Sequence, residues 1–163
     1  MHSPQPVLLK SRITVISLAF LLCSIPTHFS AQQAKPDLSG KWKLNTSKSK
    51  LEGYHAEEYR IKHSEPRLVM EYTLPFSTET YSYITDGEER LASSSSKNGV
   101  TRGKAYWDGD TLVIEGRNDR SRGSWIARYT LSQDARSLVV AEHFNKSSVS
   151  SAFDELLTFD KRK

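Results

Sequence analysis

Residues 101–117, TRGKAYWDGDTLVIEGR, contain two runs of strand-forming residues joined by the dipeptide Asp108-Gly109. In the second run Leu112 and Ile114 alternate with their neighbours, which is the period of two expected of a half-buried strand. An Asp-Gly dipeptide tolerates the positive φ that a two-residue hairpin turn requires. The stretch therefore predicts two antiparallel strands joined by a tight hairpin.

The same pattern extends along the chain in both directions. Asp86-Gly87, Asn98-Gly99 and Arg122-Gly123 separate other alternating runs, at the spacing of roughly 8 to 12 residues typical of an up-and-down β protein. No stretch keeps a helical period over three turns, and residues 46–53 are expected to form at most one short helical turn. We expect strands at residues 40–45, 57–63, 67–74, 79–85, 90–95, 101–107, 111–117, 124–131, 138–145 and 153–160.

So many strands in a small chain leave exposed edges unless the sheet closes on itself. We therefore predict an all-β fold, a single antiparallel up-and-down β-barrel of 8–10 strands. A β-sandwich is the alternative architecture.

The first 31 residues have the composition of a secretory signal peptide. Lys10 and Arg12 precede an uncharged apolar run at residues 13–23, about half the roughly 20 residues that a membrane-spanning helix needs. Ala31 is a small residue suited to the position before cleavage. We expect residues 1–31 to be removed, 32–37 to form a flexible lead, and 38–163 to form one domain released into the periplasm or outside the cell.

Cys23, the single cysteine of the chain, lies within this predicted signal peptide. The bulky residues before it do not fit a bacterial lipoprotein signal, so lipidation is not expected. The domain that remains has no disulfide, and its core must stabilise it alone.

The residues that could carry chemistry do not form a catalytic pattern. There is no G-x-S-x-G turn, and His55, His63 and His143 lie in strand-like surroundings without metal-ligand spacing. Asp108 and Asp110 lack the further oxygen donors of a calcium loop. We therefore predict a protein that is not an enzyme and has no metal and no cofactor; an enzyme would need two titratable groups converging inside the barrel.

The basic residues are scattered among acidic ones, with a formal net charge of +4. This distribution does not fit a nucleic-acid-binding surface, which would gather basic residues on one face. We expect a monomer that neither binds nucleic acid nor spans a membrane.

Two carboxylates fall on apolar rows of predicted strands. Glu142 shares its row with Val140 and Phe144, and Glu155 shares its row with Leu157. A buried carboxylate is costly unless it is paired, so each either faces a lined cavity or lies at the rim, in water or beside a cation. Aromatic side chains with polar tips could line the same cavity or pack as ordinary core. The candidate lining residues are Met70, Tyr72, Tyr81, Tyr83, Trp125, Tyr129 and Glu142.

The start of the first strand, DLSGKWKL at residues 37–44, resembles the G-x-W signature that opens lipocalins and their calycin relatives. The resemblance implies that Trp42 closes one end of the barrel and that Lys161 or Arg162 covers it. The chain also resembles small secreted bacterial lipocalin-like domains of unassigned function, through WKLN at 42–45 with Lys48-Ser49, WDGDTLVI at 107–114, and YTLS at 129–132 followed by Leu138. These resemblances imply a closed or nearly closed barrel with an internal site for a hydrophobic molecule.

The sequence also departs from these families. Thr85-Asp86-Gly87 matches only half of the later T-D-Y signature. Intracellular fatty-acid carriers of the superfamily hold a carboxylate with an Arg-x-Tyr pair on the last strand, where this chain reads LTF at 157–159. A fatty-acid carrier is therefore not indicated. We expect an exported binding protein for a small hydrophobic ligand; the alternative is an interaction or inhibitor module with a filled barrel, acting through loops 46–54 and 117–123.

Overall fold

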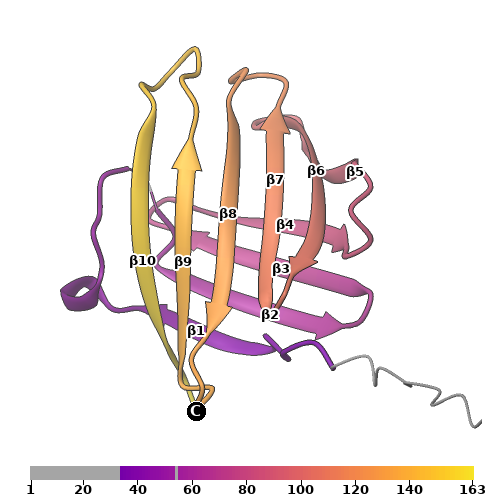
Figure 1. The fold of residues 1–163 in the computed structure, drawn as a ribbon. Helices are drawn as coiled ribbons and strands as arrows, with labels where there is room; N and C mark the ends of the chain where they lie inside the picture. Colours follow the sequence, from indigo (N-terminus) through magenta and orange to yellow (C-terminus); the bar gives the residue numbers. More distant parts are fainter. Residues whose placement is uncertain (1–33, 54) are drawn as a thin grey trace, which may run out of the picture. The chain divides into compact units, whose positions relative to one another are not determined.

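The computed structural model describes residues 34–53 and 55–163, which form ten strands (Figure 1). The predicted signal peptide at 1–31 lies outside the described residues. The strands are β1 (Gly40–Leu44), β2 (Glu58–Ser64), β3 (Arg67–Leu74), β4 (Ser77–Ile84), β5 (Arg90–Ser95), β6 (Gly99–Asp108), β7 (Thr111–Asn118), β8 (Ser124–Leu131), β9 (Ser137–Phe144) and β10 (Phe153–Lys161).

All ten predicted strands are present, with bounds that differ by at most two residues. They form one antiparallel sheet in the order β4-β3-β2-β1-β10-β9-β8-β7-β6-β5, so the prediction of an up-and-down barrel is confirmed and the sandwich alternative is wrong. Residues 46–53 contain one short 3-10 turn, Thr46–Lys48. No helix in the described ranges is long and apolar enough to cross a membrane.

The barrel is nearly closed, because the first and last strands of the sheet, β4 and β5, lie next to each other without a backbone ladder between them. Side chains bridge this gap: Asn98 Nδ2, in the β5–β6 turn, donates a hydrogen bond to Glu79 Oε1 of β4 at 2.7 Å. The close approach of β4 to this side of the sheet also explains why residue 103 of β6 is a glycine, because an added Cβ would lie 2.9 Å from the ring of Tyr83 in β4.

One end of the barrel is closed by Trp42, which has no exposed surface. Its indole N–H donates to the Leu38 carbonyl at 2.9 Å, and the Lys161 ammonium lies 5.0 Å from the ring centroid. A cation in this position interacts favourably with the face of the ring. The arrangement implied by the G-x-W resemblance is therefore confirmed, with Lys161 as the covering residue.

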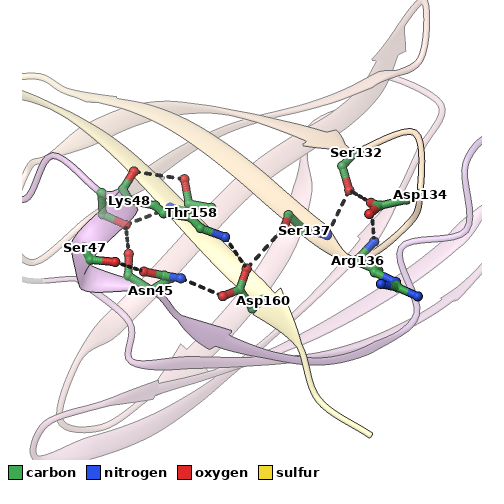
Figure 2. Close-up of polar contacts among 10 residues, drawn as sticks. Asn45, Ser47, Lys48, Ser132, Asp134, Arg136, Ser137, Thr158 and Asp160 are labelled. Atoms are coloured by element: carbon green, nitrogen blue, oxygen red, sulfur yellow. Dashed lines mark hydrogen bonds and ion pairs between the residues drawn. The ribbon is translucent and has the colours of Figure 1, made fainter.

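The connection from β1 to β2 is fastened along the outside of β10 (Figure 2). Asp160 accepts hydrogen bonds from Asn45 Nδ2 at 2.6 Å and Ser137 Oγ at 3.2 Å, and Thr158 Oγ1 donates to the Lys48 carbonyl at 3.2 Å. The bond from Asn45 is the main cause that lowers the pKa of Asp160. A bridge between Lys50 and Leu156 continues the contact, so the connection runs from the closed end toward the opposite end of the barrel.

Candidate functional site

The interior contains a cavity of ≈ 190 Å³ between the strands β2, β3, β4, β8 and β9. Inward-facing alternate residues of these strands supply most of its walls, and the β1–β2 connection supplies the remainder. The lining residues are His55, Ala56, Tyr59, Tyr72, Leu74, Glu79, Tyr81, Tyr83, Trp125, Tyr129, Glu142 and Phe144.

Five of these residues, Tyr59, Tyr72, Tyr81, Tyr83 and Tyr129, form what we call the tyrosine cluster. The rings of Tyr59 and Tyr72 meet edge to face with centroids 4.8 Å apart, and Tyr72 and Tyr81 do so at 5.1 Å. The hydroxyls of Tyr72 and Tyr129 are 3.1 Å apart. Edge-to-face and hydrogen-bonded contacts fix the ring orientations, so the cavity has a rigid aromatic wall with polar tips.

Burial keeps these phenols protonated. It raises the pKa of Tyr59, Tyr72 and Tyr129 well above 10, and the pKa values of Tyr81 and Tyr83 are raised for the same leading reason. Neutral phenols donate hydrogen bonds and offer ring faces, and they carry no charge at physiological pH.

Glu142 brings a carboxylate into this aromatic wall. It lines the cavity from β9, and it also lines a second hollow, which Lys50 and Arg128 line as well. In the part of the chain that the structure describes, its one side-chain hydrogen bond comes from the Tyr59 hydroxyl, at 3.4 Å. Burial, together with the charge of Glu155, raises the pKa of Glu142 from 4.5 to about 7.

Glu155 lies directly across the β9–β10 ladder from Glu142 and has a fully buried side chain. Its Oε2 accepts hydrogen bonds from the backbone amides of Glu52 and Gly53, both at 3.2 Å, and lies 3.3 Å from His55 Nδ1. Among the described residues, no hydrogen-bond partner reaches its Oε1. Glu155 therefore holds the β1–β2 connection against the barrel and still has unused capacity to accept a hydrogen bond.

The carboxylates do not have the basic partners that the rim interpretation required. Neither Lys nor Arg is among the described residues that line the cavity. For Glu155 the prediction of a solvated rim position or a Lys or Arg partner is wrong, because backbone amides of the folded-in connection replace water around it.

Beside the cavity, a hollow of ≈ 320 Å³ lies between the β1–β2, β7–β8 and β9–β10 connections. Trp125 and Phe144 line both the hollow and the cavity. Phe144 stacks on Phe153 with ring centroids 4.6 Å apart. Position 53 requires glycine, because an added Cβ would lie only 2.4 Å from the Phe153 ring.

The structure places six of the seven candidate lining residues at the cavity, namely Tyr72, Tyr81, Tyr83, Trp125, Tyr129 and Glu142. Met70 does not line it: this side chain has no exposed surface and packs in the core. Sequence reasoning missed Tyr59, although the alternation of Tyr59 with Ile61 would have placed it inward. It also missed His55, which precedes β2 and whose position no periodicity predicts.

The other two histidines lie elsewhere. His63 bonds Glu65 at 2.8 Å, and His143 bonds Asp154 at 2.7 Å at the surface. Within residues 34–53 and 55–163, no three Asp, Glu, His or Cys side chains are grouped to hold a metal ion.

Comparisons with known proteins support the fold. No protein-family model matches the chain, and no curated protein sequence matches it. Solved structures match it. The REP1-NXSQ fatty acid transporter is 13% identical, with a TM-score of 0.57 over 78% of this chain and 97% of the transporter. Human cRBP IV is 16% identical, with a TM-score of 0.58 over 78% of this chain and 100% of cRBP IV. Fatty-acid-binding protein 1 of Echinococcus granulosus is 10% identical, with a TM-score of 0.56 over 77% of this chain and 98% of that protein.

These similarities, with the strand order and the Trp42 closure, define the class of protein by its fold. The described part of the chain is a nearly closed antiparallel up-and-down β-barrel of ten strands, and its fold is similar to the folds of these three solved structures.

Proposed function

We propose that this chain is an exported, non-enzymatic binding protein that holds a small hydrophobic molecule inside its barrel. The observation that carries the proposal is the interior cavity, where aromatic rings form most of the wall and a few polar groups converge. Ligand sites commonly combine an apolar wall with few polar groups. Two of the structural matches are named for fatty acids, which supports a hydrophobic ligand.

The cavity limits the size of the ligand. Its ≈ 190 Å³ equals the share of roughly six water molecules, at about 30 Å³ each. It is smaller than the roughly 300–1,000 Å³ of sites for drug-sized ligands. A molecule with one ring or a short chain fits this volume better than a long acyl chain does. The alternative of an inhibitor module with a filled barrel is not favoured, because the interior is not filled.

Native mass spectrometry tests the proposal. The full-length chain would be expressed in a secreting host, and the exported protein would be weighed before and after mild organic extraction. We expect a mass excess that extraction removes. The variant Leu74→Trp, which narrows the cavity, should lose this excess, whereas Leu91→Trp at an exposed site on β5 should keep it.

A bare mass in all three proteins, with no gain of thermal stability across a panel of small hydrophobic metabolites, would contradict the proposal.

A further inference from the structure

We propose that the ligand carries a compact cation, such as a protonated amine, on an apolar body, and that Glu142 is its counter-ion within the tyrosine cluster. This inference rests on the proposed binding function and specifies the chemistry of the ligand. It draws on the charge of the cavity, the character of its walls and the hydrogen-bonding capacity left open there.

The charge in and beside the cavity is acidic. Glu142 lines the cavity, Glu155 lies across the ladder from it, and the described lining residues include neither Lys nor Arg. Glu79 also lines the cavity, so a ligand carboxylate would add a further negative charge to a site that already has three carboxyl groups in or beside it. Like charges repel strongly where the dielectric is low. A ligand cation would neutralise Glu142.

The walls suit a cation as well. Tyr and Trp rings attract a cation that lies over their faces, and cages of such rings recognise ammonium groups. The tyrosine cluster and Trp125 supply these rings around Glu142. The hydroxyls of Tyr72 and Tyr129 are hydrogen-bonded to each other, and among the described residues neither of them donates to Glu142.

The hydrogen bonds within the cavity leave the Glu142 carboxylate free to accept a hydrogen bond from a ligand. Its bond from Tyr59 is long, at 3.4 Å. Glu79, the other carboxylate of the cavity wall, is already engaged: Asn98 Nδ2 donates to its Oε1 at 2.7 Å, and the Tyr81 hydroxyl donates to its Oε2. Glu142 is therefore the cavity carboxylate with room for a new donor.

The charged groups near Glu142 come from every side of the cavity. The tyrosine cluster stays neutral, so the groups that line the cavity or lie across the ladder are Glu155 of β10, Glu79 of β4 and His55 of the β1–β2 connection. Four further charged or titratable residues line the second hollow that reaches Glu142, namely Lys50, Arg128, His143 and Asp154. His55 Nδ1 lies 2.9 Å from the Gly53 carbonyl and 3.3 Å from Glu155, so its nearest charged partner is Glu155.

Calorimetry with three compounds of matched size tests the inference: phenethylamine, 2-phenylethanol and 3-phenylpropionate. We would work about one pH unit above the pKa of Glu142, so that its carboxylate is ionised. The wild-type chain should bind the amine roughly ten- to a hundredfold more tightly than the alcohol, as a charge-assisted hydrogen bond implies. The acid should bind most weakly.

Glu142→Gln keeps the shape of the side chain and removes the charge, so it should abolish the preference for the amine while still binding the alcohol. The matched control is Asp154→Asn, a surface carboxylate on the adjacent strand, which should keep the preference. The protons that the wild-type chain releases on binding a ligand give a second test, which needs no variant. Near pH 7 the wild-type chain should release about half a proton per amine bound and none per alcohol, because the cation holds Glu142 ionised.

Equal or tighter binding of the alcohol or the acid by the wild-type chain would overturn the inference and leave the proposed binding function standing. A preference for the amine that survives in Glu142→Gln would overturn it as well. Binding of none of the three compounds would overturn the inference, while the mass excess of the exported protein decides the proposed function separately.

Discussion

Replacing Glu142 by Gln should stabilise the protein at alkaline pH and leave it unchanged at acidic pH. The pKa of Glu142 rises from 4.5 to about 7 on folding, mainly because the carboxyl group leaves water. Below about pH 4.5 the side chain is neutral in both the folded and the unfolded state, so Glu and Gln are equivalent. Between these pKa values the folded state retains a proton that the unfolded state has lost, so the stability of the wild-type chain falls as the pH rises.

The size of the effect follows from the same numbers. A difference of about 2.5 pH units, at about 1.36 kcal/mol for each, gives about 3 kcal/mol in the free energy of unfolding. The wild-type chain should lose this amount relative to Glu142→Gln between about pH 4.5 and pH 7, and no more above that range. For a single domain this is a large fraction of the typical total of roughly 5–15 kcal/mol.

Urea unfolding at a series of pH values measures the difference directly. Subtracting the wild-type curve from the variant curve removes the titration of the shared groups that do not interact with Glu142, provided that both proteins unfold in two states with equal m-values. Asp154→Asn, a change in an exposed carboxylate, should alter the free energy of unfolding by about 1 kcal/mol or less. A difference between Glu142→Gln and wild type that does not change with pH, or that favours the wild-type chain at alkaline pH, would refute the reasoning.

Four further predictions concern other parts of the chain. Glu155→Ala should speed hydrogen exchange of the Gly53 amide at least about tenfold, because that amide loses its acceptor; an unchanged rate in exchange mass spectrometry would contradict the role of Glu155. Gly116→Ala should cost about 1–3 kcal/mol in urea unfolding, since the new Cβ would lie 2.2 Å from the Trp125 ring, and a neutral effect would count against this packing. Trp42→Ala should cost about 3–5 kcal/mol; a loss below about 1 kcal/mol, again by urea unfolding, would show that Trp42 does not close the barrel. Mass spectrometry of the exported protein should show cleavage after Ala31, and a retained leader would contradict the export prediction.

The strands could be predicted from the sequence because their signals are local. Period-two rows such as Leu112 and Ile114, with Asp108-Gly109 between strands, predict where each strand lies. The row does not predict that Val113, on the opposite face, is buried as well. Nearest-neighbour pairing then follows from the short turns. Trp42 and Lys161 were linked through the family resemblance, since they lie far apart in the sequence.

The candidate site depends on information that no local pattern holds. The apolar rows of Glu142 and Glu155 left both a lined cavity and a rim position open, and the direct opposition of the two residues depends on the β9–β10 register. The burial of Glu155 depends on the β1–β2 connection, whose backbone amides at Glu52 and Gly53 reach it from about a hundred residues away. Met70 and Tyr72 share a row on β3, yet only Tyr72 reaches the cavity, because position along the strand decides between core and cavity wall.

Nuclear magnetic resonance of the chain with ¹³C-labelled tyrosine rings, recorded while phenethylamine is added, tests most directly whether the cavity is a binding site. Tyr106 serves as an internal reference, because its hydroxyl bonds Glu115 at 3.0 Å and it does not line the cavity. Ring signals of the tyrosine cluster should shift in a saturable way while those of Tyr106 stay in place. Shifts confined to Tyr106, or an unchanged tyrosine cluster at saturating amine, would contradict binding inside the barrel.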